Sequence, residues 1–224
     1  MTAFLKTLDR DTLIAEFSLW SANLLRLEED LARIAPHCDV LHVDVADGHF
    51  APAMLFFPDQ IAAVKKISQL PIHVHLMVAD EILIAQIDQF AEAGADLISI
   101  HVENQNAIEA LAHIKSKGLA SGVVLKWDTP LSSAAPYIDH INFLTLLGTE
   151  IGVKGQSLSA AAPARLKEAR ALIGPRDIIL AADGGIRDNT VPLLRAAGAQ
   201  TVVLGSLAFA APNLGARIQW LKSL

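Results

Sequence analysis

Two polar side chains, His42 and Asp44, interrupt the apolar run Leu-His-Val-Asp-Val, which has the composition of a buried β-strand. Successive side chains of a strand point to opposite faces, so His42 and Asp44 point to the same face. His75 and Asp183 lie near the ends of two further apolar runs. Two imidazoles and two carboxylates can hold a divalent cation, and these ligand types suit zinc, iron(II), manganese or cobalt. We therefore expect one divalent metal ion at these four residues.

The alternative is a purely structural role, because a buried histidine hydrogen-bonded to an aspartate also satisfies two polar groups without any ion. Four such groups at the ends of three strands favour the metal site. His73 shares a strand face with His75 but lies farther from the strand end, so we expect it to make hydrogen bonds deeper inside the protein. His101 and Glu103 are further polar residues at the end of an apolar run.

The elements that would position these residues alternate along the chain. Eight short apolar runs, typical of strands, fall at residues 12–17, 40–45, 72–77, 97–101, 121–125, 140–147, 178–182 and 201–204. Helical periodicity occupies residues 23–34, 82–93, 106–117, 161–173 and 189–197. Three of these helices are followed by a glycine and then by a strand, which indicates a repeated helix–loop–strand unit. The alternation predicts an α/β fold, a (β/α)8 TIM barrel that forms a single domain over residues 1–224.

Glycine-rich segments follow the last two expected strands, where barrels of this class often hold a phosphate group. Gly184 and Gly185 follow the seventh strand, and Gly205 and Ser206 follow the eighth. Backbone N–H groups in such segments can approach an anion closely. The segment Gly-Val-Lys-Gly-Gln-Ser, which contains Gly155, is a candidate third loop. We therefore expect a small phosphorylated substrate.

Composition and charge exclude several classes of function. Hydrophobic residues make up 52% of the 224 positions and charged residues 19%, so the chain can form a large core. The net charge of −6 argues against a nucleic-acid surface, which needs a basic face. The single cysteine, Cys38, is expected to be buried and inert, as fits a reducing compartment. The sequence has neither a signal-peptide pattern nor an uninterrupted apolar span, so we expect a cytoplasmic protein without a membrane partner.

Several segments taken together resemble the ribulose-phosphate 3-epimerase family over nearly the whole chain. The segment Leu-His-Val-Asp-Val-Ala-Asp-Gly-His-Phe-Ala-Pro is similar to the family signature His-Val-Asp-Val-Met-Asp-Gly-x-Phe-x-Pro. His-Leu-Met-Val, His-Val-Glu, Ala-Asp-Gly-Gly-Ile and Gly-Ser-Leu-Ala-Phe match in order and spacing. Phe-Ser-Leu-Trp-Ser-Ala-Asn resembles the family's Pro-Ser-Ile-Leu-Ser-Ala-Asp segment.

The resemblance implies a metal-dependent 3-epimerase of a ketose phosphate, such as D-ribulose 5-phosphate and D-xylulose 5-phosphate. His42, Asp44, His75 and Asp183 would bind the metal, and Asp44 and Asp183 would also be the catalytic acid and base. Two carboxylates on opposite faces of the substrate can remove and return a proton, with the cation stabilising the enediolate. The substrate-binding residues would be Ser18, Gly155, Gly184, Gly185, Gly205 and Ser206. Because relatives form dimers or larger rings, we also expect a homo-oligomer.

Departures from the family pattern cluster around the expected mouth of the site. Ala46 stands where the family has methionine, and Phe17 and Asn23 stand where it has proline and aspartate. The family loop Asn-Pro-Gly-Phe-Gly-Gly-Gln reads Glu-Ile-Gly-Val-Lys-Gly-Gln at residues 150–156. The motif Leu-Asn-Pro-x-Thr-Pro reads Leu-Lys-Trp-Asp-Thr-Pro at residues 125–130. We therefore hypothesise a substrate other than D-ribulose 5-phosphate, such as another pentulose, a tetrulose or a hexulose phosphate.

Two of the altered residues have two interpretations each. Lys154 is either an extra contact to a phosphate or carboxylate group or a solvated lysine of the loop. Trp127 either narrows the pocket or packs on the rim of the barrel.

Two other functions compete with the epimerase. A phosphate-barrel lyase, synthase or other isomerase is one, but the related metal-binding decarboxylases would show an Asp-x-Lys-x-x-Asp motif, and the corresponding segment here has no lysine. A non-catalytic sugar-phosphate-binding barrel is the other. A binding protein has no need of two opposed carboxylates, so retention of Asp44 and Asp183 favours an enzyme.

Overall fold

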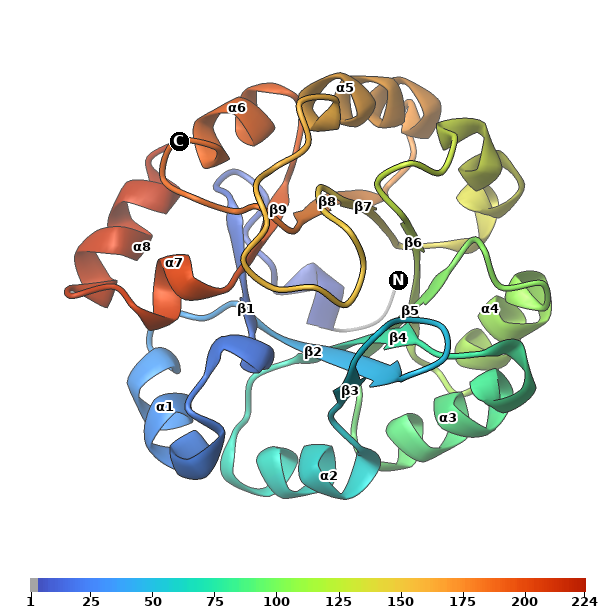
Figure 1. The fold of residues 1–224 in the computed structure, drawn as a ribbon, viewed down its shortest axis with the longest axis horizontal. Helices are drawn as coiled ribbons and strands as arrows, with labels where there is room; N and C mark the ends of the chain where they lie inside the picture. The colour runs from blue at the N-terminus through green and yellow to red at the C-terminus, as the bar shows by residue number, and fades with distance from the viewer. Residues whose placement is uncertain (1–3) are drawn as a thin grey trace.

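Eight parallel strands close into a barrel in the computed structural model, which describes residues 4–224 (Figure 1). The strands are β1 (Ile14–Ser18), β2 (Val40–Asp47), β4 (Ile72–Met77), β5 (Leu97–His101), β6 (Ala120–Leu125), β7 (Phe143–Leu147), β8 (Ile179–Asp183) and β9 (Thr201–Leu204). Each strand pairs with its neighbour in parallel register, and the β9–β1 and β1–β2 pairings close the ring. A two-residue strand, β3 (Met54–Leu55), pairs antiparallel with the end of β2. The predicted (β/α)8 barrel is therefore confirmed.

Helices surround the barrel on its outer side (Figure 1). The α-helices are α1 (Leu27–Ile34), α2 (Pro58–Ile67), α3 (Asp80–Glu92), α4 (Ala107–Ser116), α5 (Ala162–Ile173), α6 (Val191–Ala196), α7 (Ser206–Phe209) and α8 (Leu214–Lys222). The 3-10 helices are η1 (Phe4–Lys6), η2 (Leu19–Ser21), η3 (Leu24–Arg26) and η4 (Leu131–His140). None of the helices in residues 4–224 combines the length and the apolar character that a membrane span requires.

Some expected boundaries move for identifiable reasons. The strand expected at residues 140–147 begins only at Phe143, because η4 extends to His140. The helix expected at residues 23–34 divides in two: the Asn23 side chain accepts a hydrogen bond from the Leu25 N–H and caps η3, and α1 begins at Leu27. The three glycines after α3, α4 and α6 have φ values of 102°, 77° and 107°, as the repeated helix–loop–strand unit predicts.

The barrel interior changes character from one end to the other. At the amino-terminal end, η1 places Leu5 in an apolar cluster with the first residues of the strands, including Ile14, Val40 and Phe143. Farther along the strands the interior becomes polar, with buried side chains such as Glu16 and His42. The outward-facing residues of the strands form the main apolar core against the helices. The apolar end therefore closes the barrel floor, and the polar residues lie above it.

Cys38 lies in the main core with 7% of its surface exposed. Burial raises the pKa of its thiol far above the usual range, and the charge of Asp39 adds to this effect. The expectation of a buried thiol is thus confirmed, and its raised pKa disfavours the reactive thiolate.

Gly122 leaves space for the Ser99 hydroxyl inside the barrel, and a larger residue at this position should destabilise the protein. A methyl group at this position would lie 2.2 Å from Ser99 Oγ and 2.9 Å from Phe143 Cβ. Gly122→Ala should therefore lower the free energy of unfolding by about 1–3 kcal/mol, the usual cost of overpacking. Guanidinium titration followed by circular dichroism measures this. Gly215→Ala is the control, since a Cβ there makes only ordinary contacts of 3.5 Å or more in α8, and it should change stability by less than about 1 kcal/mol.

Candidate active site

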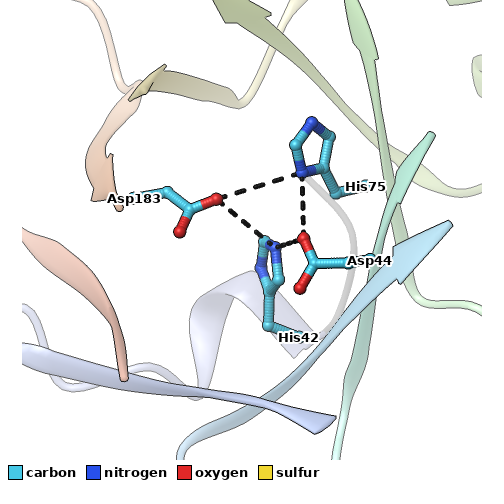
Figure 2. A group of neighbouring side chains, drawn as sticks. All are labelled: His42, Asp44, His75 and Asp183. Carbon is cyan, nitrogen blue, oxygen red and sulfur yellow. Dashed lines mark hydrogen bonds and ion pairs between the residues drawn. The ribbon is translucent and has the colours of Figure 1, made fainter. Parts of the chain in front are cut away.

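The four residues expected to bind a metal converge inside the barrel, where β2 contributes His42 and Asp44, β4 contributes His75, and Asp183 is the last residue of β8 (Figure 2). Nε2 of His42 lies 3.3 Å from Oδ1 of Asp44 and 3.9 Å from Oδ2 of Asp183. Nδ1 of His75 lies 3.3 Å from the same Asp44 oxygen and 4.0 Å from the same Asp183 oxygen. One potential ligand atom from each residue lies within 4.8 Å of those of the other three. The structure thus brings together all four residues singled out from the sequence.

The orientation of His42 is fixed from below by Glu16 of β1. Nδ1 of His42 lies 3.0 Å from Oε2 of Glu16, and an ionised carboxylate can only accept. Nδ1 therefore carries a proton, and Nε2 is the nitrogen that could present a lone pair to a cation that displaces its own proton. In the described part of the chain, this buried Nε2 has no hydrogen-bond partner, which is rare for a buried polar atom.

A similar chain of hydrogen bonds orients His75. Its Nε2 lies 2.8 Å from Nε2 of His101, and Nδ1 of His101 lies 2.9 Å from Oε2 of Glu103. Burial lowers the pKa of His101 to about 4, so the ring is neutral near pH 7. His101 donates from Nδ1 to the carboxylate of Glu103 and accepts at Nε2 from His75. Nδ1 of His75 lies 3.3 Å from Oδ1 of Asp44, and it is the nitrogen that could offer a lone pair to a cation in place of the proton it shares with that carboxylate.

Glu16 belongs to a buried polar layer that the sequence reasoning missed. Its Oε2 also accepts a hydrogen bond from Nδ1 of His73 at 2.7 Å, and its Oε1 accepts one from Thr201 Oγ1 at 3.0 Å. His73 in turn lies 2.7 Å from Ser99 Oγ through Nε2, so the expectation that His73 lies deeper and makes hydrogen bonds is confirmed. The signal in the sequence was a carboxylate in the middle of an apolar strand.

The electrostatics of the cluster favour an added positive charge. Burial opposes ionisation of Asp44, but the charge of His42 and the hydrogen bond from His75 hold the pKa of Asp44 well below its usual range. Burial and the neighbouring Asp44 charge raise the pKa of Asp183 to about 6, although His42 acts in the opposite direction. The pKa of His42 lies well above its usual value, because Asp44 and Asp183 outweigh the effect of burial. The pair of carboxylates thus attracts either a proton or a cation.

A divalent cation fits this cluster better than the layer beneath it. His42, Asp44, His75 and Asp183 can offer two imidazole nitrogens and two carboxylates, a donor set typical of transition metals. Glu16, His42 and His73 also lie close enough to form a ligand group. Both oxygens of Glu16 already accept hydrogen bonds, so this lower group serves as support for the upper one.

A cavity of ≈ 720 Å³ opens above the cluster, with Asp44, His75 and Asp183 in its wall. The loops that follow β1, β7, β8 and β9 form much of the rest. All six residues expected to bind substrate line it: Ser18, Gly155, Gly184, Gly185, Gly205 and Ser206. Trp20 and Arg187 also line it, and neither was recognised in the sequence. The size and position of this cavity are typical of a small-molecule site.

Two residues are explained differently by the structure than by the sequence. Gly185 has a φ of 70°, and a Cβ there would lie 2.6 Å from the backbone of Leu158, so glycine is required by the packing of the β7–α5 segment as well as by any bound anion. Trp127 is 40% exposed and is absent from the cavity wall formed by residues 4–224. Its position thus fits packing on the rim of the barrel, the second of its two interpretations.

The barrel and its site define a class of protein, that of the (β/α)8 barrels with a polar centre at the carboxyl ends of the strands. Solved structures with the same fold include a 3-hexulose-6-phosphate synthase, with a TM-score of 0.69 and 18% identity over 94% of this chain and 99% of that one. An orotidine 5'-phosphate decarboxylase from Pyrococcus horikoshii OT3 has a TM-score of 0.68 and 14% identity, covering 94% and 98%. At these identities the likeness establishes the fold alone.

Sequence comparison is more specific. The sequence model of the Ribulose-phosphate 3 epimerase family matches residues 14–209. A ribulose-phosphate 3-epimerase of Aquifex aeolicus is 36% identical over 88% of this chain and 89% of its own length, and that of Escherichia coli (strain K12) is 34% identical over 92% and 93%. The chain therefore belongs to the ribulose-phosphate 3-epimerase family, whose members are isomerases that act on carbohydrate phosphates.

The cluster predicts cation binding that can be measured without any substrate. We expect the wild-type protein to bind one Co2+ per chain and to gain about 2.7 kcal/mol of stability at a free metal concentration 100 times the Kd. His42→Ala should lose both effects, because it removes a ligand. The control is His113→Ala, which removes a partly exposed histidine that pairs with Asp88 at 2.8 Å. Equilibrium dialysis and thermal unfolding provide the readouts. Equal Co2+ binding by His42→Ala and wild-type protein would contradict the assignment.

The buried layer makes a separate prediction for Glu16. Glu16→Gln keeps an oxygen that can accept from both histidines but removes the negative charge that makes His42 a better ligand. We expect Co2+ affinity to fall by about tenfold, at the low end of the usual range for such supporting residues. Glu109→Gln, on the exposed side of α4, is the matched control. Dialysis at several metal concentrations measures the shift, and an unchanged Kd for Glu16→Gln would exclude a tuning role for this carboxylate.

Proposed function

We propose that the protein is a metal-dependent 3-epimerase of a ketose phosphate, acting on D-ribulose 5-phosphate and D-xylulose 5-phosphate or on a related sugar phosphate. The observation that carries this proposal is the arrangement of Asp44 and Asp183, which point toward each other from β2 and β8, with an imidazole on either side (Figure 2). Membership of the epimerase family and the cavity above the cluster support the same conclusion.

Epimerisation at the carbon beside a ketone requires a proton to leave one face and another to return to the opposite face. Asp44 and Asp183, on opposite sides of the bound substrate, would act in turn as base and acid. His42, Asp44, His75 and Asp183 would hold a divalent cation, which would supply Lewis-acid stabilisation to the negative charge that develops on the substrate oxygens. Ser18 donates a hydrogen bond to Oδ2 of Asp44 at 2.8 Å, which holds the carboxylate in one orientation for proton transfer.

The cavity would position the substrate from both ends, because the two aspartates and the glycine segments line different parts of it. Asp44 and Asp183 lie at the inner wall of the cavity, and the glycine segments after β8 and β9 form another part of it. Phosphate binding at Gly184, Gly185, Gly205 and Ser206 would use remote binding energy to orient the reacting carbon. The departures in residues 150–156 alter a loop of this same cavity, so a related pentulose, tetrulose or hexulose phosphate belongs in any substrate panel. An oligomeric assembly and a cytoplasmic location remain predictions from the sequence.

The proposal is tested by solvent exchange. In D2O, the metal-loaded protein should incorporate deuterium at C3 of its substrate and form the C3 epimer, followed by NMR with D-ribulose 5-phosphate first and the other ketose phosphates next. Asp44→Asn and Asp183→Asn should each lower the exchange rate by at least about 10²-fold, since a positioned acid or base contributes that much. Asp88→Asn, a surface substitution on α3, is the control. Metal binding with no exchange on any of these sugars would favour a non-catalytic sugar-phosphate-binding barrel.

A further inference from the structure

Two cations in the wall of the cavity have no carboxylate partner among the residues that the structure describes. Arg33 lines the same cavity but pairs with Asp30, with 2.7 Å between Nη2 and Oδ1. Lys154 and Arg187 also line it, and neither forms an ion pair with a carboxylate in residues 4–224. Unpaired positive charge within a concave surface concentrates anionic ligands.

Lys154 is directed into the mouth of the barrel. Its Nζ donates a hydrogen bond to the carbonyl oxygen of Trp20 and lies 4.7 Å from the centre of the Trp20 ring. An ammonium group has three N–H donors, so others remain for a ligand. Burial lowers the pKa of Lys154, and the charge of Asp44 opposes that shift. Although the residue as a whole is exposed, its ammonium group is therefore held at the cavity, unlike that of a solvated loop lysine.

Arg187 extends from the other side of the same region. It follows Gly185 by two residues, and its backbone N–H donates to Thr190 Oγ1 at 2.8 Å, which fixes the turn. Its Nη1 donates to the carbonyl oxygen of Ile186 at 2.8 Å. A guanidinium group has five N–H donors in a planar fork, and most of them remain for a further partner.

The strand order places these cations on both sides of the loop that follows β9. β9 pairs with β8 on one side and with β1 on the other, so Arg187 follows one neighbour and Trp20 follows the other. The loop after β9 touches the loop after β1, since a Cβ on Gly205 would lie 2.8 Å from Ser21 Oγ. Lys154 reaches Trp20 from the segment between β7 and α5, which crosses the mouth of the barrel in Figure 1.

We propose that Lys154 and Arg187 together bind the phosphate group of the substrate, one from each side of the loop after β9. This inference rests on the proposed function, from which it takes the phosphorylated substrate. A phosphate ester carries a charge of about −1.5 to −2 near pH 7, which two cations neutralise. Charge-assisted hydrogen bonds from the ammonium and the guanidinium add to those of the backbone N–H groups. Phosphate binding also holds the β7–α5 segment over the reacting carbon, because Lys154 belongs to that segment.

The test is the affinity of the metal-loaded protein for inorganic phosphate, measured by isothermal titration calorimetry. Lys154→Met and Arg187→Met should each raise the Kd about tenfold, and the double variant about 100-fold, as expected for the loss of one or two charge-assisted hydrogen bonds. Lys154→Arg, which retains the charge, should remain within about threefold of wild type. Arg33→Met removes a cation of the same cavity that is already paired, and it should change the Kd by less than about twofold.

Kinetics separate this inference from the proposed function. The KM of D-ribulose 5-phosphate, or of the best ketose phosphate, should rise in the Met variants in parallel with the Kd of phosphate, whereas any turnover of unphosphorylated D-ribulose should not change. One outcome is a wild-type protein that epimerises no ketose phosphate, together with two Met variants that bind phosphate more weakly than it does. That outcome would overturn the proposed function and support the phosphate-binding site. An active wild-type protein whose variants bind phosphate as tightly as it does would overturn the binding site and leave the function in place.

Discussion

The carboxylate of Glu16 is fully buried in the barrel, and the geometry of the cluster above it depends on that one group. It accepts hydrogen bonds from two imidazoles and a hydroxyl, so it fixes His42 with Nε2 toward the aspartates. Burial opposes its ionisation, but His73 and His42 hold its pKa far below the usual range. An isolated buried charge would be strongly destabilising, so the loss of any of these hydrogen-bond partners should destabilise the buried carboxylate. The site is thereby preorganised before any ligand arrives.

The barrel places the two aspartates of the site so that their carboxylates face each other. Asp44 and Asp183 are remote in sequence, yet β2 and β8 both present their carboxyl ends to the same opening. An apolar floor around Phe143 and Leu5 closes the other end, so chemistry is confined to one side of the protein. The loops after β7, β8 and β9 then surround the cavity, and changes in those loops can alter the substrate while the carboxylate pair stays the same.

The sequence predicted the barrel and the four clustered residues because both follow from local patterns. Apolar runs mark buried strands, and the alternation of side chains places His42 with Asp44 and His73 with His75. Glu16 was missed because its role depends on three partners from other strands, none of which is near it in the sequence. The sequence could not predict that the Lys154 side chain points into the cavity either, since its contact with Trp20 joins residues 134 positions apart. Likewise the 3-10 helix η4 was not predicted, because it contains Pro136 and its residues do not follow α-helical periodicity.

The central claim is that the upper cluster binds the cation and that the Glu16 layer only supports it. The most direct measurement is a crystal structure of the zinc-loaded protein with anomalous data collected on both sides of the zinc absorption edge. The account predicts one zinc peak, within about 2.0–2.2 Å of His42 Nε2, His75 Nδ1 and an oxygen of each of Asp44 and Asp183. A peak between Glu16, His42 and His73, or no ordered zinc in the barrel, would contradict it.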